Sequence, residues 1–92
     1  GFQDFLTRYA WGEVWGSDGV DRRTRSCLTL AILAALGIEA EFAMHVRAAL
    51  RNGVPAEHIR EVLMHVALYA GLPRANAAFA TANAILSEEN AI

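Results

Sequence analysis

The feature that most constrains the fold is a run of apolar residues from Leu28 to Leu36. The run is apolar nearly all round a helix, which predicts a buried central helix rather than a surface one. Asp21 can cap the first turn through its side chain, and Gly37 can adopt the left-handed conformation that ends many helices. We therefore predict a buried helix over 22–36.

Four other segments space their apolar residues by three and four, which is the helical period. They predict helices at about 2–15, 39–52, 55–69 and 74–87, separated by glycine- and proline-containing turns. No segment alternates like a strand. The expected fold is all-α, a domain of about five helices whose short connections favour antiparallel neighbours.

The amount of apolar surface is large for a chain of 92 residues, of which 54% are hydrophobic. A rich helical core would explain it, and so would an obligate oligomer whose subunits share a core. Surface-to-volume scaling favours the oligomer, because a domain this small buries only about 60% of its unfolded surface. We expect one domain, 1–92. Its helical pattern begins at Phe2 without a cap, so we expect a missing amino-terminal part.

Charge and cysteine content exclude several functional classes. The formal net charge of −2 and the pI of about 5.9 argue against a nucleic-acid partner, which would require a basic surface. No run of about 18 apolar residues predicts a membrane span, and no signal peptide is visible. Cys27 is the single cysteine, so no disulfide can form within the chain. We expect a cytoplasmic protein.

Two arginines mark a candidate anion site on the predicted central helix. Arg22, Arg25 and Thr29 share one face, which continues into an apolar stripe. Cations near a helix amino terminus oppose the helix dipole. That conflict suggests either an anionic ligand or a salt bridge, and the sequence alone leaves both open.

Two histidines are each four residues from a glutamate on the same predicted helix. Glu41 can pair with His45, and Glu61 can pair with His65, which also lies beside Tyr69. A neighbouring carboxylate raises the pKa of an imidazole and fixes its tautomer. Ordinary exposed pairs would look the same. Zinc binding is disfavoured, because a site needs three or four protein ligands.

Glu13 lies between two tryptophans, Trp11 and Trp15, just before a glycine turn. The tryptophans can form a rigid apolar wall. A carboxylate beside such a wall can act as a general acid or base. Packed tryptophans next to an exposed glutamate are the alternative explanation.

Four segments carry a resemblance to a known family. They are RYAWGEVWG at 8–16, DRRTRS at 21–26, MHVRAALRNGV at 44–54 and EVLMHVALYAGLPRAN at 61–76. On these segments the sequence resembles the carboxymuconolactone decarboxylase family over nearly the whole chain. The last two segments are shared by the wider AhpD-like superfamily, and the first two are specific to the decarboxylase branch. The resemblance implies an AhpD-like homo-oligomer, commonly a trimer or hexamer.

The peroxidase-type members of that superfamily carry a Cys-x-x-Cys pair, a histidine four residues later and a relay glutamate one helix earlier. On this sequence the two cysteine positions fall at Ile38 and Glu41. The histidine position is His45, and the relay position is Ser26. A thiol peroxidase needs a thiolate and a resolving thiol. The sequence excludes that cycle, and the adjacent Cys27 replaces neither thiol.

The resemblance implies the loss of CO₂ from a five-membered unsaturated lactone that carries two carboxylates. The product would be the enol-lactone of 3-oxoadipate, in the protocatechuate branch of the β-ketoadipate pathway. The electrons left behind can delocalise through the ring double bond into the lactone carbonyl, so no cofactor and no metal are expected. The alternative is a non-catalytic or differently specific family member that binds a small organic acid.

The expected site follows from that reaction. Arg22 and Arg25 should bind carboxylates, one of them the acetate side chain that stays. Tight binding of the departing carboxylate would stabilise the ground state instead. An apolar wall of Trp15 and Leu33 would suit a carboxylate that becomes CO₂.

Proton transfer is assigned to the remaining polar groups. His45, with His65 as second choice, should donate a hydrogen bond or proton at the lactone oxygen. Glu13 should protonate the ring carbon or orient His45, and Tyr69 should donate a hydrogen bond. The expected catalytic residues are thus His45, Glu13 and Arg22, and the expected substrate-binding residues are Arg25, His65, Tyr69 and Trp15.

Overall fold

The computed structural model describes residues 1–90 as a helical domain, and no strand occurs among them. The helices are α1 (Phe2–Leu6), the π-helical segment η1 (Thr7–Val14), α2 (Arg22–Leu36), α3 (Glu39–Arg51), α4 (Ala56–Ala70) and α5 (Leu72–Glu88). The all-α prediction is confirmed. The predicted bounds of the central helix are those of α2, and each bound of α3 to α5 lies within two residues of the predicted one.

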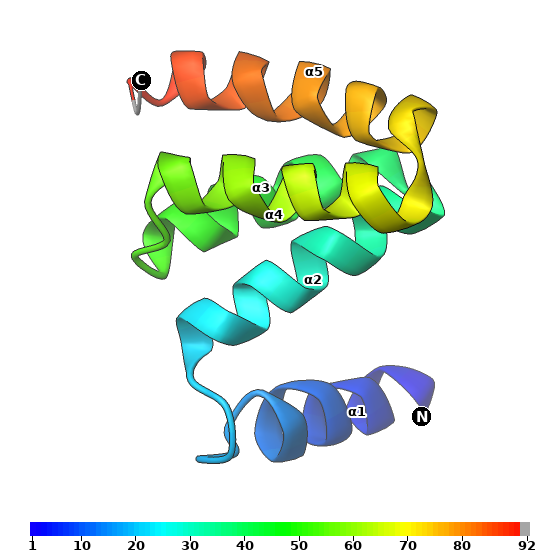
Figure 1. Ribbon diagram of the computed structural model, residues 1–92. Helices are drawn as coiled ribbons and strands as arrows, with labels where there is room; N and C mark the ends of the chain where they lie inside the picture. Colours follow the sequence, from blue (N-terminus) through cyan, green and yellow to red (C-terminus); the bar gives the residue numbers. More distant parts are fainter. Residues whose placement is uncertain (91–92) are drawn as a thin grey trace.

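Helix α2 is the element around which the others pack. It contacts α3, α4 and α5, while α5 also packs against α3 and α4. Figure 1 shows α2 crossing between these helices and the amino-terminal helix. Leu30 and Ala34 of α2 are buried in the core, together with Phe42, Leu63 and other apolar side chains of α3, α4 and α5.

Both predicted ends of α2 form as expected. The Asp21 carboxylate accepts a hydrogen bond from the backbone N–H of Thr24 at 2.8 Å, which caps the first turn. Gly37 follows the last turn with φ of 72°, and its N–H donates to the carbonyl oxygen of Ala34. Residues that carry a side chain rarely adopt this backbone conformation, so glycine is strongly favoured there.

The amino-terminal helix differs from the prediction of one regular helix over 2–15. Its first turns are α-helical, and η1 then widens, with the N–H of Trp15 donating to the carbonyl oxygen of Ala10 five residues earlier. Gly12 lies within this stretch and is a poor α-helix former. No residue of α1 or η1 is buried. This helix therefore contributes nothing to the core of the single chain.

Replacing Gly37 tests the junction of α2 and α3. A Cβ at Gly37 would overlap the guanidinium of Arg74 and would strain the positive φ. We expect Gly37→Ala to lower the free energy of unfolding by about 1–3 kcal/mol. Chemical denaturation measures it.

Gly19→Ala is the matched control. Gly19 lies in an exposed turn and does not have a positive φ. The control should leave stability unchanged or raise it slightly. Equal losses for the two variants would contradict the assigned role of Gly37.

Candidate functional site

A hollow between the end of η1 and one face of α2 contains two of the predicted site residues. It has a volume of about 200 Å³ and is lined by Val14, Trp15, Arg25, Leu28, Thr29 and Ile32. Helical spacing places Arg25, Leu28, Thr29 and Ile32 on one side of α2. Apart from Arg25 and Thr29, the lining side chains are apolar, and the guanidinium of Arg25 supplies the charge. We call this hollow the Arg25 hollow.

The Arg25 side chain is half-buried, and its environment leaves one donor unused. Its Nε atom is shielded from solvent and has no hydrogen-bond partner among the described residues. A buried donor without an acceptor costs about 1–3 kcal/mol, and more for a charged group. A carboxylate is the acceptor that guanidinium geometry fits best. The Arg25 hollow is therefore suited to a small carboxylic acid.

The tryptophan wall forms in part. The rings of Trp11 and Trp15 lie 5.6 Å apart between centroids and are tilted by 36°. Trp15 is half-buried and lines the Arg25 hollow, whereas Trp11 is exposed. Leu33, expected beside Trp15, lines a different hollow, so that expectation is wrong. The apolar partners of Trp15 are Leu28 and Ile32, because they share the Arg25 side of α2.

A second, more open hollow lies between α2 and α4. It has a volume of about 450 Å³ and is lined by Thr24, Cys27, Leu28, Ala31, Glu61, Val62 and His65. The ring of His65 contacts that of the exposed Tyr69, with centroids 4.9 Å apart. Leu28 lines this hollow and the Arg25 hollow, so the two adjoin at that side chain. Trp15 and Arg25 thus line the hollow on one side of Leu28, and His65 lines the hollow on the other.

The three predicted catalytic residues are not part of either hollow. Arg22 and Glu13 are exposed, and His45 is half-buried on α3, between the buried Phe42 and Ala49 in the sequence. The single chain therefore does not bring the predicted arginine, glutamate and histidine into one pocket.

Cys27 has the properties of a poor nucleophile. Burial raises the pKa of its thiol, and the negative charge of Asp21 adds to that effect. A raised pKa lowers the thiolate fraction on which reactivity depends. Among residues 1–90, no group of three or more His, Cys, Asp or Glu side chains is placed to hold a metal ion.

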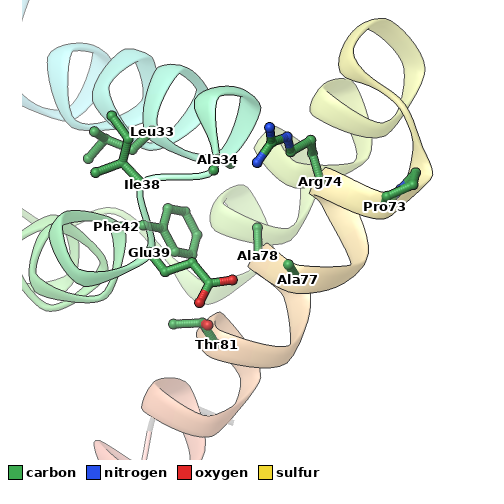
Figure 2. Close-up of a pocket in the computed structure, with 11 residues that line it drawn as sticks. Leu33, Ala34, Ile38, Glu39, Phe42, Pro73, Arg74, Ala77, Ala78 and Thr81 are labelled. Carbon is green, nitrogen blue, oxygen red and sulfur yellow. The ribbon is translucent and has the colours of Figure 1, made fainter.

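A third hollow was not anticipated from the sequence. It has a volume of about 180 Å³ and lies where the end of α2, the start of α3 and the start of α5 meet. Figure 2 shows Arg74 and Glu39 on different sides of it, with Phe42 and Ala78 between them in this view. No pattern in the sequence connects these segments, because only the packing of α5 onto α2 and α3 brings them together.

Comparison with known proteins decides the family. The sequence model that describes the carboxymuconolactone decarboxylase family matches residues 1–84 of this chain. The chain belongs to this family. The resemblance found in the sequence is therefore confirmed. In the described part of the chain, no helix is both long and apolar enough to cross a membrane.

Three relatives show how far this likeness extends. The 4-carboxymuconolactone decarboxylase of Acinetobacter baylyi is 48% identical over 95% of this chain and 65% of its own length. The nitrosuccinic acid decarboxylase npaB of Metarhizium robertsii is 42% identical, over 77% and 50%. An uncharacterized 15.0 kDa protein of Paracoccus denitrificans is 30% identical, over 87% and 61%. The chain therefore spans between 50% and 65% of the length of these relatives.

The cap of α2, which presents Arg25, predicts an acid-dependent loss of stability. The hydrogen bond from Thr24 lowers the pKa of Asp21 in the folded state. The resulting stabilisation is present above the unfolded pKa of about 3.9 and is lost as the pH falls through the lower folded pKa. We expect Asp21→Asn to be less stable than the original chain at pH 6, and this difference to vanish in strong acid.

Thermal unfolding followed by circular dichroism between pH 6 and pH 2 measures this difference. Asp21→Ala, which removes the cap as well as the charge, should be destabilised throughout that range. A constant difference between Asp21→Asn and the original chain at every pH would contradict the proposed role of the charge.

Proposed function

We propose that this protein is a 4-carboxymuconolactone decarboxylase that works without a cofactor. The observation that carries the proposal is the buried Nε of Arg25, which has no hydrogen-bond partner within residues 1–90 and lies at an apolar hollow walled by Trp15. A bound carboxylate would satisfy this donor. The likeness to the Acinetobacter baylyi decarboxylase over 95% of the chain supports the choice of substrate.

The substrate is a lactone with two carboxylates, and the reaction breaks the bond between the ring carbon and one of them. The bonding electron pair moves through the ring double bond to the lactone carbonyl oxygen, CO₂ leaves, and a proton is added to the ring. The protein must anchor the dianion, stabilise the developing oxyanion and supply that proton. None of these tasks requires an electron sink beyond the substrate itself.

Arg25 is proposed to hold the acetate carboxylate that stays on the product. The walls formed by Trp15, Leu28 and Ile32 suit the other carboxylate, since an apolar surrounding favours neutral CO₂ over the anion. His65, across Leu28, is proposed to contact the same substrate from α4, with Tyr69 behind its ring.

His45, Glu13 and Arg22 are proposed to complete the site at an interface between subunits of an AhpD-like trimer or hexamer. Large apolar side chains lie exposed on α1, α2 and α4, among them Phe2, Ile32 and Leu68. Exposed apolar side chains that gather into a patch are typical of a face that packs against another subunit, which is the role proposed for them here. The proposed compartment is the cytoplasm, because a single cysteine such as Cys27 stays reduced there.

A decarboxylase for a different small acid is the second candidate. The 42% identity to nitrosuccinic acid decarboxylase npaB favours it, because that relative is named for another carboxylic acid. Both candidates use the same arginine to bind a carboxylate. They differ in which acid is decarboxylated. Measuring the turnover of both acids when they are supplied together in one assay therefore distinguishes the candidates.

Turnover of enzymatically made 4-carboxymuconolactone, followed in the ultraviolet with and without chelator, tests the proposal. We expect chelator to have no effect. Losing a hydrogen bond to a charged group costs about 1.5–3 kcal/mol, so Arg25→Ala should lower kcat/KM about 10- to 100-fold. His45→Ala should lower kcat by at least about 100-fold if it transfers the proton.

Arg51→Ala is the matched control, since Arg51 is exposed at the far end of α3 and lines none of the three hollows. It should keep the original kcat/KM. If Arg22→Ala and His45→Ala both kept it as well, the proposed site would be wrong. No turnover of the lactone by the full-length protein would reject the function itself.

Mixing two variants of reduced activity tests whether the site lies between subunits. We expect Arg25→Ala and His45→Ala proteins to regain activity when unfolded and refolded together, because some mixed interfaces would then hold both original residues. Sedimentation should give three or six times the chain mass. Restored activity needs the two residues to come from different chains, so failure of mixed oligomers to regain it would place the whole site within one chain.

A further inference from the structure

The hollow where α2, α3 and α5 meet carries chemistry that the proposed reaction does not use. Leu33, Phe42 and Ala78 give it an apolar lining, and Phe42 is only 2% exposed. Its volume of about 180 Å³ is below the 300–1,000 Å³ of sites for drug-sized ligands. The space suits a single ring or a short branched chain.

Two opposite charges lie at this hollow without neutralising one another. Neither Arg74 nor Glu39 forms an ion pair or a side-chain hydrogen bond with any residue in the described range 1–90. Figure 2 shows Arg74 reaching toward the end of α2, while the Glu39 carboxylate lies near Thr81. The two ends of the hollow therefore offer a cation at one side and acceptor oxygens at the other.

The backbone leaves room for the guanidinium at this position. Gly37 has no side chain, and a Cβ there would overlap the guanidinium of Arg74. The carboxyl end of α2 also attracts a cation, which accounts for where the Arg74 side chain rests. That attraction is worth less than a paired carboxylate and leaves the planar array of N–H donors available.

We propose that this hollow is a second small-molecule site, which binds a single-ring or branched carboxylate that carries a hydrogen-bond donor at its far end. The carboxylate pairs with Arg74, the apolar body packs on Phe42 and Ala78, and the donor reaches Glu39 or Thr81. The site is separate from the Arg25 hollow, since the two share no lining residue.

Titration of the full-length protein with 4-hydroxybenzoate tests the proposal, with binding followed by methyl NMR of labelled alanines. Ala34, Ala77 and Ala78 line the hollow and report on it directly. We expect their signals to shift with a Kd on the order of 1 mM, as befits so small a ligand. Benzyl alcohol, which lacks the carboxylate, should bind at least tenfold more weakly, and benzoate should be intermediate.

Variants locate the binding. Arg74→Ala should weaken 4-hydroxybenzoate binding at least tenfold, whereas Arg51→Ala should not. Because Arg74→Ala also removes a favourable charge from the end of α2, Ala77→Leu provides a second variant that fills the hollow and keeps the guanidinium. Arg25→Ala should keep the shifts of the three alanines.

Three results would overturn the second site. Equal affinity for 4-hydroxybenzoate and benzyl alcohol would remove the role of Arg74. Unchanged binding in both Arg74→Ala and Ala77→Leu would place the ligand elsewhere. Shifts confined to Ala31, which lines the hollow between α2 and α4, would assign the binding to that surface instead.

Discussion

The burial of one side of α2 among α3, α4 and α5 is the interaction on which the rest of the structure depends. Leu30, with none of its surface exposed, lies at the centre of this packing. Removing such side chains from water stabilises a fold by about 25 cal/mol for each Å² of apolar surface. Because the helix is fixed by its buried side, the direction of its other sides is fixed too.

Those other sides of α2 carry the chemistry. One presents Arg25 toward Trp15, and an adjoining one presents Thr24 and Cys27 toward His65 of α4. The end of the helix forms a wall of the third hollow, where Arg74 lies over Gly37. All three hollows therefore share one rigid element. Loss of its cap or of its packing should disturb them together.

The sequence predicted the regular helices well because their signals are local. Apolar spacing, the Asp21 cap and Gly37 act within a few residues of one another, and the structure has the same bounds for α2. The amino-terminal helix was predicted less well. Its apolar residues Phe2, Phe5 and Tyr9 follow the helical period but are exposed, so no core in the single chain fixes its turns. Its wider turns follow from no pattern in the sequence.

The sequence by itself determined the family, the helical class and the residue types that can bind a carboxylate. It also separated this chain from thiol peroxidases, since Ile38 and Glu41 stand at the two cysteine positions. Only the tertiary structure decided that Trp15 and Arg25 share a hollow, that Leu33 does not line it, and that Arg74 and Glu39 line another. The physical reason is distance along the chain. Helical periodicity assigns a side chain to a face, but which faces meet depends on how whole helices pack.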